Sequence, residues 1–136
     1  MVDSLKLLAP WIYAAAAARL WRVRRDLAQL GFAPSVERWL RAITPHAALH
    51  EHEPQRLARF MHRLGRYLRG SRCLDQSLAL TSVLRQRGYH ADLIIGAERK
   101  PTGFNAHAWV EIDGQALDES GEPRARLSVL ETWPKA

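Results

Sequence analysis

The stretch FNAHAWVEIDGQALDES, residues 104–120, decides the fold class of this chain. Side chains in its first nine residues alternate between an apolar set and a set containing His107 and Trp109, which is the two-residue period of a half-buried strand. Asp113-Gly114 then supplies the two-residue turn typical of a β-hairpin. The turn pairs Ile112 with Gln115, and the sequence therefore predicts an antiparallel hairpin.

The register of this hairpin predicts which acidic side chain faces the histidine. Counting back from the turn, Trp109 is opposite Asp118, so Asp118 lies on the face of His107 and diagonal to it. Diagonal neighbours are about 7 to 8 Å apart, within reach of an imidazole and a carboxylate. Glu119 is predicted to point to the opposite face, and Glu111 lies too far along the strand. Asp118 is therefore the predicted partner of His107.

The first half of the chain has helical rather than strand periodicity. Apolar residues recur at spacings of three and four, Gly31 is predicted to end the first helix, and Ser35 is predicted to cap the second. Pro54 is predicted to open the third helix and Gly70 to end it. The full set of predicted elements is helices over 16–30, 36–43, 54–69 and 73–87, and strands over 91–96 and 127–131, with the hairpin between the strands.

Helices followed by one helix on a small antiparallel sheet predict an α+β fold. We expect a single domain over residues 1–136, with a helical part over 1–69 and a catalytic core over 70–136. A chain of 136 residues can bury a core without disulfides or metals. The single cysteine fits a reducing compartment, and the apolar N-terminal stretch, interrupted by Lys6 and Pro10, is too short to span a bilayer. The predicted location is cytoplasmic, with membrane association unlikely.

Charge and histidine content suggest partners but do not establish them. The net charge of +6 would suit an acidic peptide or nucleic acid, although a solvated arginine-rich surface explains it equally well. His46, His50 and Glu53 could share a helix face and bind zinc, but Pro54 suggests a helix end or a loop, and a solvated polar loop is the alternative. We predict no metal, no cofactor and no nucleic-acid partner.

The only cysteine, Cys73, lies in RGSRCLDQSLAL (69–80), where a helix is predicted to begin. Backbone N–H groups and the helix dipole at that position lower a thiol pKa, and Arg72 acts in the same direction. An inert packed thiol is the alternative. In chain order, Cys73, His107 and Asp118 form a Cys-His-Asp arrangement, in which the histidine takes the thiol proton and the carboxylate fixes the tautomer. A His107–Asp118 pair made for packing alone is the alternative to catalysis.

The stretches SRCLDQSLALTSVLRQRGYHADLIIGA and FNAHAWVEIDGQALDES resemble the transglutaminase-like leader peptidases of lasso-peptide biosynthesis, the microcin-processing B proteins. The resemblance covers roughly residues 70–120. It implies a transglutaminase or papain-like cysteine protease core in which Cys73 is the nucleophile, His107 the general base and acid, and Asp118 the orienting acid. The Cys73 backbone N–H is a natural oxyanion donor.

The same resemblance implies a function and partners. The chain would be the free-standing peptidase that cleaves the leader from a ribosomally made precursor peptide through an acyl-enzyme. It would work beside a separate leader-binding protein and an ATP-dependent, asparagine-synthetase-like lasso cyclase. Two other functions remain open from the residues: acyl transfer to an amine by the same side chains, and a non-catalytic adaptor that holds a peptide.

Overall fold

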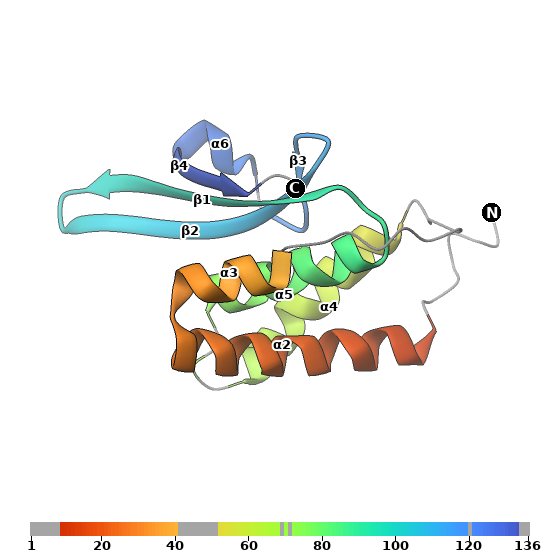
Figure 1. The fold of residues 1–136 in the computed structure, drawn as a ribbon. Helices are drawn as coiled ribbons and strands as arrows, with labels where there is room; N and C mark the ends of the chain where they lie inside the picture. The colour runs from red at the N-terminus through yellow and green to blue at the C-terminus, as the bar shows by residue number, and fades with distance from the viewer. Residues whose placement is uncertain (1–8, 41–51, 69, 71, 120, 134–136) are drawn as a thin grey trace.

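The computed structural model describes residues 9–40, 52–68, 70, 72–119 and 121–133. It contains helices and a four-stranded antiparallel sheet, which confirms the predicted α+β class (Figure 1). In chain order the elements are α2 (Pro10–Leu30), α3 (Phe32–Leu40), α4 (Glu53–Tyr67), α5 (Cys73–Gln86), β1 (Ala91–Lys100), β2 (Gly103–Ile112), β3 (Gln115–Ala116), α6 (Pro123–Arg126) and β4 (Ser128–Trp133).

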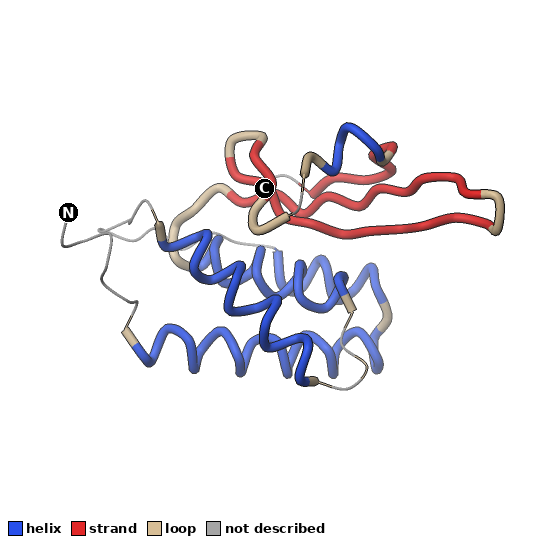
Figure 2. The backbone as a smooth tube through the Cα atoms, turned by 180° about the vertical axis from the view of Figure 1, so that it is seen from behind, coloured by secondary structure: helices blue, strands red, loops and turns tan. Residues whose placement is uncertain are grey.

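The helices and the sheet form two layers. The strand order is β3-β2-β1-β4, so the two long strands β1 and β2 occupy the centre. Helices α2 to α5 cover one face of the sheet, and the short helix α6 lies on the other side of it (Figures 1 and 2). Among the helices of the described segments, none is both long and apolar enough to cross a membrane.

Helix α5 lies at the centre of the core, between the other helices and the sheet. Nine consecutive residues, 77–85, are buried on it, including the polar Ser77 and Thr81. Its side chains pack against α2, α3 and α4 on one side and against β1 and β2 on the other. A helix surrounded in this way cannot tilt or slide without opening the core, so its first residue, Cys73, is held in a fixed place.

Buried Arg85 connects the end of α5 to three separate segments. Its side chain is 1% exposed and donates to the carbonyl oxygens of Ala91 (2.9 Å), Leu40 (2.8 Å) and Trp133 (2.7 Å). Those carbonyls belong to β1, α3 and β4. Five fixed N–H donors allow one guanidinium to satisfy several buried acceptors. Arg85 thus fastens the helical layer to the sheet.

The sheet has a second, smaller core on its α6 side. Trp109 is 1% exposed and packs with Ile94 and Leu127. Gly96 makes room for this ring, because a Cβ atom there would lie 3.0 Å from the Trp109 ring. The indole N–H donates to buried Glu111 at 2.8 Å. This small core thus joins β2 and β1 to Leu127, the residue that follows α6.

Several predicted boundaries differ from the observed ones. The first helix begins at Pro10, a residue favoured in the first turn of a helix because its missing N–H has no intrahelical acceptor there. Ser35 is not a cap: α3 begins at Phe32, and the Ser35 hydroxyl donates to the Gly31 carbonyl at 2.7 Å. The first strand extends beyond residue 96 to Lys100, and the single turn of α6 was not predicted.

Candidate active site

Cys73 is the first residue of α5 and is partly buried. The start of the helix is fixed by Asp75, whose carboxylate accepts a hydrogen bond from the Arg72 backbone N–H at 3.1 Å. The Gln76 N–H donates to the Arg72 carbonyl at 3.1 Å, which closes the first helical turn. The predicted position of the thiol at the N-terminus of a helix is thus confirmed.

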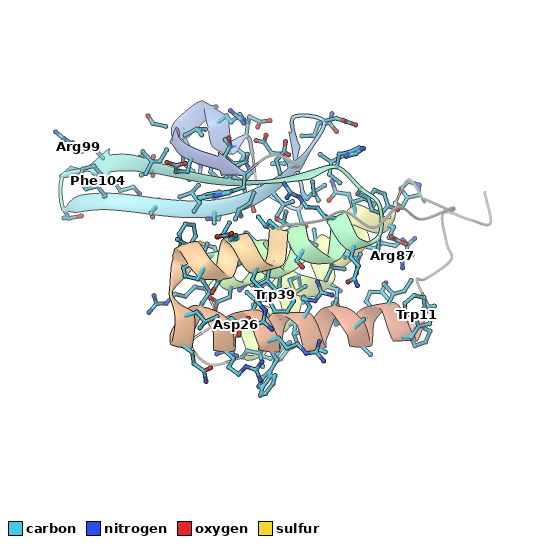
Figure 3. All side chains as sticks on the ribbon, viewed as in Figure 1. Trp11, Asp26, Trp39, Arg87, Arg99 and Phe104 are labelled. Atoms are coloured by element: carbon cyan, nitrogen blue, oxygen red, sulfur yellow. The ribbon has the colours of Figure 1, made fainter. Side chains whose placement is uncertain are left out.

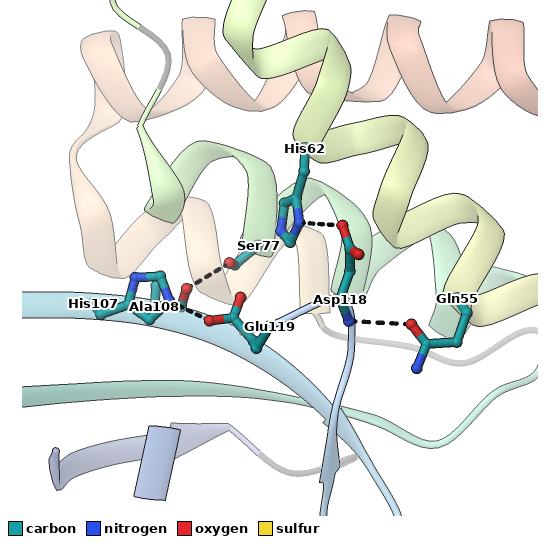
Figure 4. A network of polar contacts seen from close by, with 7 residues as sticks. All are labelled: Gln55, His62, Ser77, His107, Ala108, Asp118 and Glu119. Atoms are coloured by element: carbon teal, nitrogen blue, oxygen red, sulfur yellow. Dashed lines mark hydrogen bonds and ion pairs between the residues drawn. The ribbon is translucent and has the colours of Figure 1, made fainter. Parts of the chain in front are cut away.

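A buried hydrogen bond holds this end of α5 against β2. The Ser77 hydroxyl donates to the Ala108 carbonyl at 3.0 Å (Figure 4). Ser77 lies one helical turn after Cys73, and Ala108 follows His107 in the strand. The bond therefore sets the distance between helix and strand at the position where the thiol meets the imidazole. Cys73 and His107 form a side-chain hydrogen bond.

His107 uses both of its ring nitrogens. Its Nε2 lies 2.6 Å from Oε1 of Glu119, whose side chain is 9% exposed (Figure 4). Because Nε2 is occupied, Nδ1 is the nitrogen left for the Cys73 thiol. The ring also stacks on Trp109, with centroids 5.9 Å apart and planes at 18°. A packed ring with a carboxylate on one nitrogen has a fixed orientation and tautomer.

The thiol and the imidazole shift each other's pKa toward the charged forms. The pKa of Cys73 is lowered, mainly by the hydrogen bond with His107 and further by backbone hydrogen bonds from Ala108 and Leu74, while burial opposes the change. The pKa of His107 is raised from 6.5 to about 9, first by Cys73 and then by Glu119, again against burial. Both directions favour a thiolate–imidazolium pair at neutral pH, which is the reactive form of a cysteine nucleophile.

Asp118, the predicted partner of His107, makes a different contact. Its carboxylate lies 2.8 Å from Nδ1 of His62 on α4, and its backbone N–H donates to the Gln55 side chain at 3.1 Å (Figure 4). The predicted placement of the two carboxylates, with Asp118 facing His107 and Glu119 pointing away from it, is therefore wrong. The structure brings Cys73 and His107 together but puts Glu119, not Asp118, on the imidazole.

The reason is that the return strand stops early. The predicted register holds for its first residues, with Ile112 paired to Gln115, and Leu117 N–H still donates to the Val110 carbonyl at 2.9 Å. Asp118 then has a positive φ of 50°, a left-handed conformation in which the alternation of side chains between faces ends. The chain turns toward α4, and the Glu119 side chain returns to the imidazole.

The profile described as transglutaminase-like superfamily matches residues 15–132, which is most of the chain. The chain belongs to the transglutaminase-like superfamily. The match begins inside α2 and covers α3 to α5 and nearly all of the sheet, so the helical layer is part of the matched region.

The transglutaminase-like chain also has a relative among characterised proteins. It is 40% identical over 60 residues to the microcin J25-processing protein McjB of Escherichia coli. The aligned region is 44% of this chain and 28% of that protein, so the chain spans less than a third of the relative's length. No solved structure matches significantly. The resemblance predicted from the sequence is thereby confirmed at the level of the family.

Three side chains around the site were not predicted from the sequence, Ser77, Gln55 and His62, and a fourth, Glu119, was predicted to point away from it. A serine one turn after a helix-start cysteine could have been recognised as a residue facing the sheet. Gln55 and His62 lie seven residues apart on α4, hence on one helix face, and could have been recognised as neighbours. Nothing in the sequence places that face beside residue 118.

The zinc alternative concerns a different part of this transglutaminase-like chain. Glu53 is not available to a metal, because its carboxylate is 1% exposed and forms an ion pair with Arg87, with oxygen–nitrogen distances of 2.5 and 2.8 Å. His46 and His50 lie outside the described residues. Within the described segments no group of three or more potential ligands forms a metal site.

Proposed function

We propose that this protein is a cysteine peptidase that removes the leader from a ribosomally made lasso-peptide precursor. The single observation that carries the proposal is the hydrogen-bonded Cys73–His107 pair, whose pKa shifts favour thiolate and imidazolium. The likeness to a microcin-processing protein supports the choice of substrate class. The proposed place of action is the cytoplasm, where the precursor is made.

In the proposed reaction the Cys73 thiolate attacks the carbonyl carbon of the last leader residue. A carbon–sulfur bond forms and the carbonyl oxygen becomes an oxyanion, for which the Cys73 backbone N–H at the start of α5 is the proposed donor. The His107 imidazolium gives its Nδ1 proton to the departing amine as the carbon–nitrogen bond breaks. The products of this half-reaction are a thioester to the leader and the free amine of the core peptide.

Water then hydrolyses the thioester. Neutral His107 takes a proton from the water, whose oxygen attacks the thioester carbon, and the carbon–sulfur bond breaks. The leader leaves as a carboxylic acid, and the proton returns the pair to thiolate and imidazolium. Neither of these two reaction steps needs redox or metal chemistry, so we propose no cofactor.

We assign the orienting role to Glu119, which contacts His107, in place of the predicted Asp118. A carboxylate on Nε2 keeps the ring turned toward the thiol and stabilises the imidazolium. Asp118 is proposed to act indirectly, by anchoring the turn on α4. Substituting the two acids separately distinguishes these roles, as described in the Discussion.

The proposed partners are the precursor peptide, a separate leader-binding protein and an ATP-dependent, asparagine-synthetase-like cyclase that closes the freed core amine onto an acidic side chain. A leader-binding partner raises the local concentration of the cut site at the thiol. We expect the protein alone to cleave precursor slowly and the addition of that partner to accelerate cleavage.

The test is incubation of purified protein with a lasso-peptide precursor, with and without a leader-binding protein, followed by mass spectrometry. Hydrolysis predicts a leader carrying a free carboxylic acid and an intact core peptide. A leader joined to an added amine would instead identify the enzyme as an acyl transferase. Equal rates with and without the partner would contradict its proposed role, and no processed product under either condition would contradict the proposed function.

A further inference from the structure

A pocket of about 560 Å³ opens between the second half of α2 and the start of α5. Three arginines line it, Arg24, Arg25 and Arg72, together with one aromatic ring, Trp21, and one carboxylate, Asp75. We call it the arginine pocket. Its side chains come from two elements far apart in the sequence, so it is formed only in the folded protein.

The carboxylate in the arginine pocket does not cancel its positive charge. Three guanidinium groups and one carboxylate give a net charge of +2. Asp75 is already engaged, since it accepts the Arg72 backbone N–H and lies 3.7 Å from the Arg24 guanidinium. The Arg72 side chain is exposed at the surface. The pocket therefore presents a positive field to an incoming ligand.

Arg25 is held by an aromatic ring and makes one long ion pair. Its guanidinium lies 5.3 Å from the centre of the Trp21 ring, which fixes it by a cation–π contact. The nearest carboxylate, Asp26, lies 3.9 Å away. That carboxylate also accepts a hydrogen bond from the Trp39 indole at 3.0 Å and pairs with Arg38 at 3.1 Å, on the α3 side of α2 (Figure 3).

The arginine pocket lies at the same end of α5 as the nucleophile, with Cys73 itself outside the pocket lining. Arg72 directly precedes Cys73 in the chain, and Asp75 lies two residues after it. Consecutive Cα atoms are about 3.8 Å apart, and an extended peptide advances about 3.3 Å per residue. Two or three residues of an extended peptide therefore span about 7 to 10 Å, which is more than the Cα separation between Cys73 and its neighbour Arg72 in the pocket lining.

We propose that the arginine pocket binds an acidic side chain of the peptide substrate, within a few residues of the bond that Cys73 attacks. Guanidinium groups bind carboxylates through paired, charge-assisted hydrogen bonds, and the Trp21 ring offers an apolar wall for the methylene groups of the same side chain. The inference rests on the proposed function for the identity of the substrate, but its test does not require peptide cleavage.

The test compares two thiol reagents that differ only in charge, iodoacetyl-glutamic acid amide and iodoacetyl-glutamine amide. Both alkylate Cys73, and both carry their side chain a short distance from the reacting carbon. We expect the glutamate reagent to react about three- to tenfold faster, after correction for the rates with free cysteine, because exposed ion pairs contribute up to about 1 kcal/mol each. Raising the salt concentration should reduce this ratio.

The variant Arg25→Glu/Arg72→Glu should invert the ratio, so that the glutamine reagent reacts faster. Arg99→Glu is the matched control, because it makes the same kind of charge change at the tip of the β1–β2 hairpin (Figure 3). It should leave the ratio as in the unchanged protein. Arg25→Gln/Arg72→Gln, which removes charge without reversing it, should bring the ratio close to one, and thermal unfolding checks that each variant is folded.

Equal corrected rates for the two reagents in the unchanged protein would overturn the arginine pocket proposal. A preference for the glutamate reagent that survives Arg25→Glu/Arg72→Glu would overturn it too, since the charge would then act from elsewhere. The proposed function fails by a different result: alkylation of Cys73 by both reagents at a rate below that of free cysteine. The ratio of the two alkylation rates can be measured even in that case, so failure of the pocket proposal and failure of the proposed function are distinguishable.

Discussion

The protein contains two histidine–carboxylate pairs whose acids are neighbours in the chain, and only one of them has a nucleophile. Glu119 pairs with His107 on β2, and Asp118 pairs with His62 on α4, at 2.6 and 2.8 Å. Their histidines are similarly exposed, at 27% and 24%. The difference is that His107 also hydrogen-bonds Cys73, the only sulfhydryl in the sequence.

A histidine–carboxylate pair is therefore not evidence of catalysis by itself. The pair on α4 joins a helix to a turn, with Gln55 holding the backbone of the same turn at 3.1 Å. The pair on β2 fixes an imidazole whose other nitrogen meets a thiol at a helix start, where thiolate is favoured. The His62–Asp118 pair therefore positions the His107–Glu119 pair, because it holds the turn from which Glu119 reaches the imidazole of His107.

The largest difference between the two histidine–carboxylate pairs should appear when each histidine is removed in turn. His107→Ala should lower turnover by about 10²- to 10⁴-fold, the usual contribution of a general acid–base group, and should raise the pKa of the Cys73 thiol. His62→Ala should leave that pKa nearly unchanged. Both effects can be measured from precursor cleavage and from the pH dependence of alkylation. A larger loss for His62→Ala would reverse the roles given to the two pairs.

The next largest effect concerns the two acids. Glu119→Gln should lower turnover severely and Asp118→Asn much less. In a serine protease triad the corresponding change costs about 10⁴-fold, and a cysteine enzyme should lose less because a thiolate needs less help from its base. Both substitutions are nearly isosteric, so kcat can be compared at equal thermal stability. If Asp118→Asn is the more damaging, the predicted Cys-His-Asp arrangement is restored and the Glu119 contact is incidental.

The pH profile gives a further measure of the β2 pair. Because the pKa of His107 is raised to about 9, the imidazolium and hence the active ion pair should persist up to about pH 9 and be lost above it. Glu119→Gln removes a charge that raises this pKa, so the alkaline limb of kcat/KM should move to lower pH. Asp118→Asn should leave the limb in place. An alkaline limb near pH 6.5 in the unchanged protein would contradict the assignment.

The smallest expected effect is that of Gln55→Ala. Its side-chain oxygen accepts a hydrogen bond from the backbone N–H of Asp118, so its loss removes a hydrogen bond that positions the turn. A net contribution of about 0.5–1.5 kcal/mol corresponds to a decrease in turnover of about two- to tenfold. Arg66→Ala, an exposed substitution on the same helix, is the control. If the two variants have equal kcat, the Gln55 hydrogen bond does not position the turn for catalysis.

The same comparison separates what the sequence could predict from what it could not. The hairpin register near the turn was predictable because Asp113-Gly114 fixes it locally, and the pairing of Ile112 with Gln115 is confirmed. The helix start at Cys73 was predictable from its flanking residues. Both predictions depend on interactions between residues close in sequence, where local rules apply.

The prediction failed where a contact distant in sequence takes over. Asp118 leaves the strand because its N–H and its carboxylate find partners on α4, more than 50 residues earlier in the chain. An aspartate also tolerates the left-handed conformation that this exit requires. The bonds of Arg85 to three separate carbonyls were unpredictable for the same reason. Register counting assumes that a strand continues, and only tertiary structure shows where it stops.

The most direct test of the central claim is leader release by the unchanged protein and by Cys73→Ala under identical conditions. Cys73 is only partly buried, so removing its sulfur should cost little stability and the variant should unfold at nearly the same temperature. The account predicts rapid release of the leader by the unchanged protein and none above background by the folded variant. Equal release by Cys73→Ala would show that the thiol is not the nucleophile.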